Sequence, residues 1–239
     1  MDLEIKGKIA LVTGGSRGIG LAIATSLARE GAKVCLAARS RDTLDRAVAE
    51  LRAQGAEAHG VSVDLATPAG AQQAVAETIS TFGRIDFLVN NTGGSLGSGS
   101  FDSASAAKWQ EVIDLNLYAA VWCSQHAVSF MKAHGGGCIV HIGSISGREY
   151  TSSAPYGAAK AAMVGLAKEM AVDLAKHQIR VNTVAPGSIM FEGGSWDKRR
   201  VTHPELIERM LSSDLPWGRF GRPDEVAELV TFLCSARAS

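Results

Sequence analysis

A tyrosine and a lysine lie one helical turn apart in the segment YGAAK, residues 156–160. If this segment is helical, Tyr156 and Lys160 share a helix face, because side chains at i and i+4 are neighbours. A phenol titrates at about pH 10, so it exchanges protons poorly at neutral pH. A neighbouring cation favours the phenolate and lowers the pKa of the phenol. So short a motif also fits an ordinary amphipathic helix that happens to carry both residues, and the rest of the sequence must decide between the two.

Three glycines follow the first apolar run, KIALVT, in the segment TGGSRGIG, residues 13–20. Gly14, Gly18 and Gly20 permit a tight turn between strand and helix and let bare backbone approach a pyrophosphate. The N-terminus of the next helix offers unpaired N–H groups to the phosphates. This glycine loop predicts dinucleotide binding; the alternative is a glycine-rich turn without a ligand.

The end of the second apolar run, LAARSR, indicates which dinucleotide is bound. A carboxylate there would bind the adenine ribose of NAD(H) and repel a 2′-phosphate. No acid occurs before Asp42; Arg39 stands in that place, and Arg17 lies in the glycine loop. Two guanidinium groups can hold a phosphate in charge-assisted hydrogen bonds. The pattern favours NADP(H), with NAD(H) as the alternative.

Short apolar runs alternate with helix-like segments along the 239 residues. Such alternation predicts βαβ units and a parallel sheet covered by helices on both faces. We expect strands within residues 8–13, 32–38, 56–64, 84–90, 136–144 and 179–187, and helices within about 19–30, 42–54, 68–82, 105–133 and 155–177. No linker or repeat divides the chain, so residues 1–239 are predicted to form a single doubly wound α/β domain of the Rossmann type.

Composition excludes several classes of protein. Lys+Arg and Asp+Glu balance at 24 each, which does not favour a nucleic-acid or anionic-membrane partner. The four cysteines are scattered without a CxxC pair, which argues against a disulfide framework or a metal site and suits a reducing compartment. No apolar run approaches the roughly 18 residues of a membrane span, and the N-terminus lacks the layout of a signal peptide. These features predict a cytoplasmic protein.

The motifs, taken in order, resemble those of the short-chain dehydrogenase/reductase family. They are TGGSRGIG, VDL (63–65), NNTG (90–93), Asn116 in DLNLYAA, Ser144 in HIGS, YGAAK and VAPG (184–187). The resemblance covers nearly the whole chain and is greatest to the branch with 3-oxoacyl-acyl-carrier-protein reductases and many sugar, polyol and secondary-alcohol dehydrogenases. It implies hydride transfer between NADP(H) and a small-molecule carbonyl or secondary alcohol. The alternative is a non-catalytic dinucleotide-sensing scaffold with the same fold.

The resemblance also implies residue roles. Tyr156 is the general acid or base, and Lys160 lowers its pKa and binds the nicotinamide ribose. Ser144 binds the substrate oxygen, with Ser146 as a rival, and Asn116 holds a water that connects Lys160 to solvent. Asp64 is implied to bind the adenine and could also cap the next helix. The implied cofactor-binding residues are Gly14, Ser16, Arg17, Gly18, Ile19, Gly20, Arg39, Asp64, Leu65, Asn90, Thr92, Gly93, Tyr156, Lys160, Pro186, Gly187 and Ile189.

Several positions depart from the family pattern. Thr92 replaces the usual alanine, and Phe191 stands where the family commonly has a threonine that binds cofactor phosphate. Residues of about 188–215 are expected to form a substrate lid, with Phe191 and Trp196 as its apolar cover. Few basic residues lie near the helix ends that carrier-protein-dependent relatives use, which weakens a carrier-protein substrate.

Two expectations concern assembly. The segments 105–133 and 155–177 carry apolar residues on more than one face, which favours a homodimer or homotetramer built across them. The chain stops at FLCSARAS, where the family continues into a further strand, so this final C-terminal strand is expected to be absent.

Overall fold

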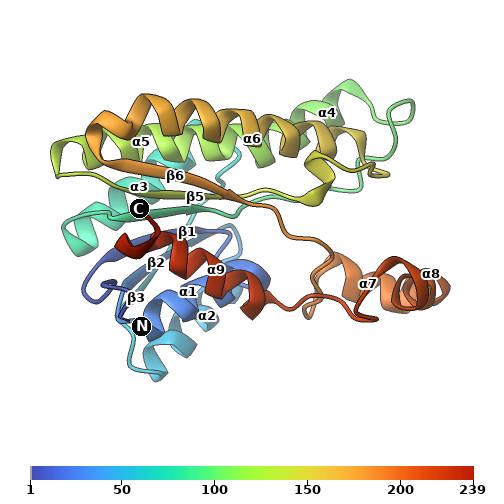
Figure 1. Ribbon diagram of the computed structural model, residues 1–239, viewed down its shortest axis with the longest axis horizontal. Coiled ribbons are helices and arrows are strands. Elements are labelled where there is room, and N and C mark those ends of the chain that lie inside the picture. Colours follow the sequence, from blue (N-terminus) through green and yellow to red (C-terminus); the bar gives the residue numbers. More distant parts are fainter. Residues whose placement is uncertain (1) are drawn as a thin grey trace.

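The computed structural model describes residues 2–239 and shows a six-stranded parallel sheet between two layers of helices (Figure 1). The strands are β1 (Ile9–Thr13), β2 (Lys33–Ala38), β3 (Ala58–Ser62), β4 (Phe87–Asn90), β5 (Gly137–Ile142) and β6 (Ile179–Val184). They lie in the order β3-β2-β1-β4-β5-β6, so the direction of winding reverses between β1 and β4. Ligands of such sheets bind at this reversal, outside the carboxyl ends of the strands. The predicted doubly wound α/β fold is confirmed.

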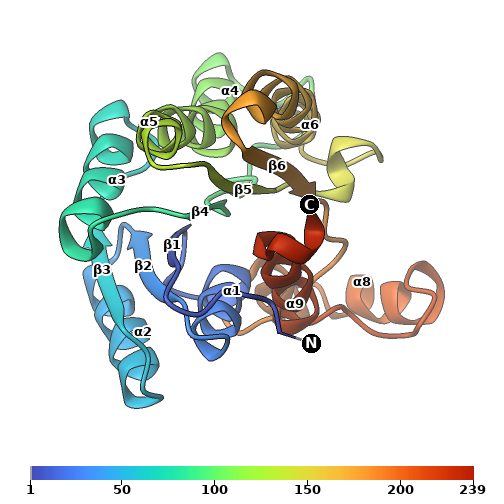
Figure 2. The ribbon, with the colours of Figure 1, turned by 60° about the vertical axis from the view of Figure 1, so that its left-hand side comes forward.

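The strands are apolar because helices cover both faces of the sheet (Figure 2). One face is covered by α1 (Gly18–Arg29), α2 (Arg41–Ala53) and α9 (Pro223–Cys234). The other is covered by α3 (Pro68–Phe82), α5 (Ala119–Ala133) and α6 (Ala154–Leu174). All residues of β1 and β4 are buried, as expected for central strands in this position.

The segment 105–133, expected as one helix, is divided in the structure. It consists of α4 (Ala106–Ile113), the π-helical turn η1 (Asp114–Tyr118) and then α5. A π-helical turn accommodates one extra residue, and such turns are frequent at functional sites. Asn116 lies inside η1 and is fully buried. The expected helix over 155–177 is α6, followed by the short 3₁₀ turn η3 (Ala175–His177).

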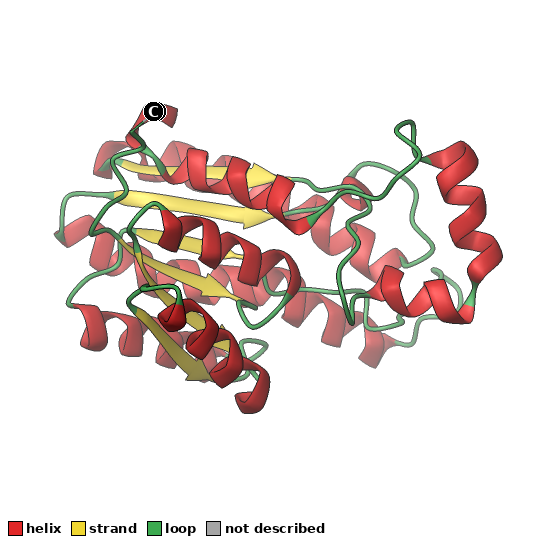
Figure 3. Ribbon diagram, turned by 90° about the horizontal axis from the view of Figure 1, so that it is seen from below, coloured by secondary structure: helices red, strands yellow, loops and turns green. Residues whose placement is uncertain are grey.

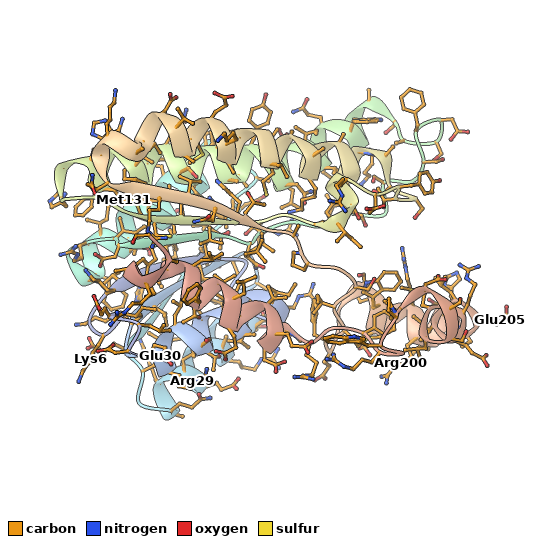
Figure 4. All side chains as sticks on the ribbon, in the orientation of Figure 1. Lys6, Arg29, Glu30, Met131, Arg200 and Glu205 are labelled. Atoms are coloured by element: carbon orange, nitrogen blue, oxygen red, sulfur yellow. The ribbon has the colours of Figure 1, made fainter. Side chains whose placement is uncertain are left out.

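The segment predicted to be a lid, residues 188–215, projects beyond the carboxyl ends of the strands (Figures 1 and 3). It contains α7 (Ser195–Thr202), α8 (Pro204–Arg209) and the π-helical turn η4 (Met210–Asp214). Arg200 and Glu205 lie on this projection, away from the sheet (Figure 4). A small apolar cluster holds it together, formed by Ile207, Met210 and Phe220 with Met190, Trp196, Leu206 and Leu215.

The chain after α9 forms the 3₁₀ turn η5 (Ala236–Ala238), and no strand follows it within residues 2–239. Arg180 of β6 holds this end in place by donating to the carbonyls of Leu233 and Ser235, at 2.8 and 2.9 Å. Over the same described residues, no helix is long and apolar enough to cross a membrane, and no cluster of three or more potential ligands could hold a metal ion.

Candidate active site

Tyr156 and Lys160 lie in the first turns of α6, close to the carboxyl end of β5. Pro155 fits the start of this helix because its missing N–H is not needed there. The Lys160 ammonium lies 5.7 Å from the centre of the Tyr156 ring and donates to the Ile142 carbonyl at 2.8 Å. The ammonium is almost completely buried, and burial lowers the pKa of Lys160 to about 8. The structure therefore brings the predicted pair together.

Ser144 follows β5 and faces the Tyr156 phenol. Burial raises the pKa of Tyr156, and the Ser144 hydroxyl opposes part of that rise. The resemblance implies that Lys160 lowers this pKa, whereas in the folded chain burial has the largest effect and raises it. Ser144 Oγ accepts a hydrogen bond from the Ser146 N–H at 3.1 Å. Ser146 therefore orients Ser144 through its backbone.

Asn116 connects η1 to the loop that follows β4. Its Nδ2 donates to the Gly94 carbonyl and its Oδ1 accepts from the Gly94 N–H, both at 2.9 Å. A third bond, from Nδ2 to the Val112 carbonyl at 2.8 Å, fixes the amide within the helix. A Cβ on Gly93 would lie 2.5 Å from Asn116 Oδ1 and 3.1 Å from Lys160 Nζ, so Asn116 and Lys160 both approach this backbone closely.

The glycine loop lies between β1 and α1 and has the backbone that a dinucleotide requires. Gly14 and Gly18 have positive φ, +64° and +56°, and a Cβ on Gly20 would lie 2.3 Å from the Gly14 carbonyl oxygen. The Asn91 side chain supports the loop by donating to the carbonyls of Thr13 and Gly14, at 2.9 and 3.2 Å. We did not single out Asn91 from the sequence, although the paired asparagines of NNTG were a signal. Bare backbone at a helix N-terminus fits a pyrophosphate.

The two arginines predicted to bind a 2′-phosphate lie in different surroundings. Arg39 follows β2 and is exposed to solvent. Arg17, also exposed, donates from Nη1 to the Gly193 carbonyl of the lid at 2.7 Å. The Phe191 ring packs on the glycine loop, because a Cβ on Gly18 would lie 2.6 Å from its nearest ring atom. The lid therefore contacts the glycine loop through an apolar ring and a guanidinium group.

The carboxyl ends of β3 and β4 carry further predicted cofactor residues. Asp64 is exposed and accepts from the Ala66 N–H at 3.1 Å, while Leu65 beside it is buried. Thr67, and not Asp64, caps α3, because its hydroxyl accepts from the Gly70 N–H. Thr92 Oγ1 is buried without a hydrogen-bond partner among the described residues.

Asn90 lies beneath this surface, inside the sheet layer. Its Nδ2 donates to Ser124 Oγ at 3.0 Å and lies 3.3 Å from His141 Nδ1. His141, which we did not single out from the sequence, is completely buried. Burial and the charge of Lys160 lower the pKa of His141 to about 4.

The loop after β6 reaches the site from the other side. The Pro186 carbonyl accepts from the Ile145 N–H at 3.1 Å, which joins this loop to the one that carries Ser144. Gly187 follows, and Ile189 forms a bridge with Gly221 at the base of the lid. The predicted residues of both loops therefore lie together beside the ends of β5 and β6.

Together, the strand order, the glycine loop and the buried tyrosine and lysine define a dinucleotide-binding α/β protein with a site suited to proton transfer. The sequence profile of the family described as short chain dehydrogenase matches residues 8–194. The chain belongs to this family.

Named relatives are oxidoreductases of several kinds. The chain is 37% identical over 241 residues to 2-(S)-hydroxypropyl-CoM dehydrogenase 3 of Xanthobacter autotrophicus, covering 100% of this chain and 94% of that protein. It is also 37% identical to a 3-oxoacyl-acyl-carrier-protein reductase of Aquifex aeolicus, with the same coverage of 100% and 94%.

A solved structure agrees with this relationship. L-sorbose reductase from Gluconobacter frateurii, in complex with NADPH and L-sorbose, superposes with a TM-score of 0.93 at 37% identity. The match covers 100% of this chain and 93% of that one. This chain is therefore a member of a family of dehydrogenases and reductases that share its fold.

Proposed function

We propose that this chain is an NADP(H)-dependent oxidoreductase that interconverts a small carbonyl compound and its secondary alcohol. The observation that carries the proposal is the meeting of Tyr156, Lys160 and Ser144 at the carboxyl ends of the strands, beside a glycine loop suited to a dinucleotide. When bound, the nicotinamide supplies or accepts the hydride.

Each side chain has a distinct part in the proton transfer. Tyr156, whose pKa is raised by burial, keeps its proton at neutral pH and donates it to the substrate oxygen in the reductive direction. Ser144 donates a hydrogen bond to that oxygen and shares its developing charge. Lys160, with a pKa of about 8, is largely protonated at neutral pH and stabilises the phenolate that remains.

Asn116 and the cofactor loops complete the proposed site. Asn116 holds the loop of Gly93 and Gly94 against Lys160, on the route by which a proton would return to Tyr156. Arg39 is free to meet a 2′-phosphate, whereas Arg17 would have to exchange the Gly193 carbonyl for the phosphate. The NADPH bound by the similar sorbose reductase supports the choice of NADP(H).

The substrate class is proposed more broadly, as a 3-oxoacyl thioester or a sugar or polyol. Arg148 and Glu149 are exposed on the loop after Ser144 and form an ion pair at 3.4 Å, so this edge suits a polar substrate as readily as an acyl one. The names of the relatives span thioester, sugar and steroid chemistry. All four cysteines are buried free thiols, which suits a cytoplasmic location.

The test is a substrate panel. Purified protein would be mixed with NADPH or NADH and with acetoacetyl thioesters, ketoses that include L-sorbose, and simple ketones, while the absorbance of the reduced nicotinamide is followed. The proposal predicts turnover with at least one carbonyl class and a preference for NADPH. Tight NADPH binding without turnover across the panel, in either direction, would instead favour the non-catalytic sensor.

A further inference from the structure

A row of polar side chains crosses three neighbouring strands just below Lys160. Asn90 of β4 is the register partner of His141 in β5, which is the partner of Thr183 in β6. Register partners in a parallel sheet point to the same face. Two residues earlier on each strand, the same face carries Leu88, Ile139 and Val181, which belong to the hydrophobic core. The polar row (Asn90, His141 and Thr183) therefore separates this core from the active site.

The polar row is costly to bury, because its hydrogen bonds are incomplete. Asn90 Nδ2 can only donate, so His141 Nδ1, 3.3 Å away, accepts, and the neutral ring carries its proton on Nε2. His141 Nε2, Asn90 Oδ1 and Thr183 Oγ1 are all buried without a partner among the described residues. Unpartnered buried polar atoms destabilise a fold and require an explanation. An apolar residue at position 141 would remove the unpartnered His141 Nε2, so a histidine at this position is expected to serve a function.

His141 lies next to the anchor of the catalytic lysine. Lys160 Nζ donates to the carbonyl of Ile142, the residue that follows His141 in β5. The two side chains are close enough that the lysine charge contributes to the low pKa of His141, so the imidazole is neutral. Among the described titratable residues, Tyr156 on α6 lies beside Lys160, and the charge of Lys160 acts on His141 of β5. The neutral side chains of Asn90 and Thr183 flank His141 in the sheet, and Ser124 of α5 bonds Asn90. Asn116 of η1 approaches the same Gly93 backbone as Lys160 does.

A neutral polar side chain at position 141 suits a protonated Lys160 better than a charged or an apolar one does. A carboxylate would bind the ammonium in a buried ion pair and raise the pKa of Lys160, whereas a second cation would repel it. An apolar side chain would increase the desolvation that already lowers the pKa of Lys160. Lys160 would then lose its proton near neutral pH and could no longer stabilise a Tyr156 phenolate.

We propose that His141 is a positioning residue that acts through Lys160. Its neutral ring, held by Asn90, keeps the layer beneath the ammonium polar, so that Lys160 remains protonated at the pH at which Tyr156 transfers protons. Only the effect of His141 on catalysis rests on the proposed function. Its physical content, the control of the lysine pKa by residue 141, can be measured without turnover.

The experiment compares His141→Thr with His141→Val, two β-branched variants of nearly equal shape that differ by a hydroxyl group. Both remove the same volume, so packing defects are matched, and thermal unfolding would confirm that each folds. The side-chain Cε signals of lysine would be titrated by NMR in the full-length protein, with Lys160 assigned from Lys160→Met. We expect the pKa of Lys160 to be lower in His141→Val than in His141→Thr by about 0.5 or more, a threefold change in its dissociation constant.

An equal pKa of Lys160 in the two variants, or a higher one in His141→Val, would overturn the proposal. If either variant does not fold, His141→Asn and His141→Leu form a second polar and apolar pair with the same expected difference. In an active preparation, the alkaline limb of kcat/KM for carbonyl reduction should move to lower pH in the apolar variant and stay near that of the wild type in the polar one. If the alkaline limbs of the two variants fall at the same pH, His141 has only a structural role. If no protein turns over, the proposed function fails while the lysine titration still decides this inference.

Discussion

At the scale of single residues, Gly93 has no room for a side chain, because Asn116 and Lys160, two of the proposed catalytic residues, approach it closely. In Gly93→Ala the new Cβ would lie 2.5 Å from Asn116 Oδ1 and 3.1 Å from Lys160 Nζ, so both must move. We expect kcat/KM to fall by at least about tenfold, a loss of roughly 1.4 kcal/mol of transition-state stabilisation. Gly94→Ala is the control, because its Cβ meets nothing within 4 Å. Equal activity of the two variants would contradict this description of the site.

Cofactor preference is a second property of single residues. Arg39→Asp replaces an attraction for the 2′-phosphate with a repulsion, and charge-assisted hydrogen bonds contribute about 1.5–3 kcal/mol. We expect the preference for NADPH over NADH in kcat/KM to fall by about a hundredfold. Arg46→Asp, on the exposed face of α2, is a control for the change of charge. An unchanged preference in Arg39→Asp would make NAD(H) the better assignment and Arg39 a solvated surface charge.

The roles of some of these residues can be predicted from the sequence and those of others cannot, for a physical reason. Tyr156 and Lys160 could be paired from spacing alone because both lie on one helix, and the glycine loop could be recognised because its residues are consecutive. The roles of Gly93, Asn91 and His141 come from neighbours distant in sequence, such as Lys160 for His141. The position of Arg17 in the sequence predicts a phosphate ligand, whereas its bond to Gly193 depends on where the segment 188–215 folds.

At the scale of elements, the lid contacts the glycine loop through one hydrogen bond that can be removed. Arg17→Ala deletes the bond to the Gly193 carbonyl, and a typical hydrogen bond contributes about 1 kcal/mol. We expect amide hydrogen exchange in residues 190–200 to become about fivefold faster. The variant should also prefer NADPH less than the wild type does, by a smaller factor than Arg39→Asp.

The control for the lid is Arg200→Ala, which removes an exposed ion pair with Asp197 at 2.9 Å within α7. Exposed pairs of this kind contribute little, so exchange should change much less. The same exchange rates in Arg17→Ala and the wild type would mean that the packing of Phe191 alone holds the lid.

Helices and strands can be predicted where one periodicity of apolar residues persists, and less well where that periodicity is interrupted. The strands follow from apolar runs that end at glycine or polar residues, and their observed bounds fall inside the predicted ranges. The π-helical turn at Asn116 has no counterpart in the apolar pattern, because it depends on the bonds of Asn116 to Val112 and Gly94. The strand order likewise could not be predicted from the apolar pattern, because it depends on which strands pair in the folded chain.

At the scale of the whole molecule, α5 and α6 lie on the outside of the sheet (Figure 1). Some of the apolar side chains of α6 are exposed. Val164 and Val172 of α6 are 51% and 63% exposed. Tyr118 of η1, which is also exposed, stacks on Trp122 of α5. We predict a dimer across these helices. Val164→Asp should shift the protein toward monomers in analytical ultracentrifugation. Val201→Asp, a similar change at an exposed lid position, should not; a monomeric wild type would refute the interface.

Stability of the whole chain should depend on pH through His141. Its pKa is lowered from 6.5 to about 4 in the folded state, so the unfolded chain binds more protons between these values. The free energy of unfolding therefore loses nothing through His141 above pH 6.5. As pH falls from 6.5 toward 4, it decreases by about 3 kcal/mol in total. In His141→Thr the free energy of unfolding, measured with denaturant at a series of pH values, should fall less steeply over this window. An identical slope would show that His141 does not titrate on unfolding as described.

In the proposed mechanism Tyr156 transfers the proton through its hydroxyl group, which contributes little to cofactor binding. The most direct measurement is a comparison of Tyr156→Phe with the wild type on the best carbonyl substrate of the panel, with NADPH affinity measured by fluorescence titration in both. The variant keeps the ring and removes only the hydroxyl, so we expect binding to change by less than about threefold and turnover to fall by at least about a thousandfold. Turnover near the wild-type rate, with the cofactor bound normally, would contradict the mechanism proposed for this site.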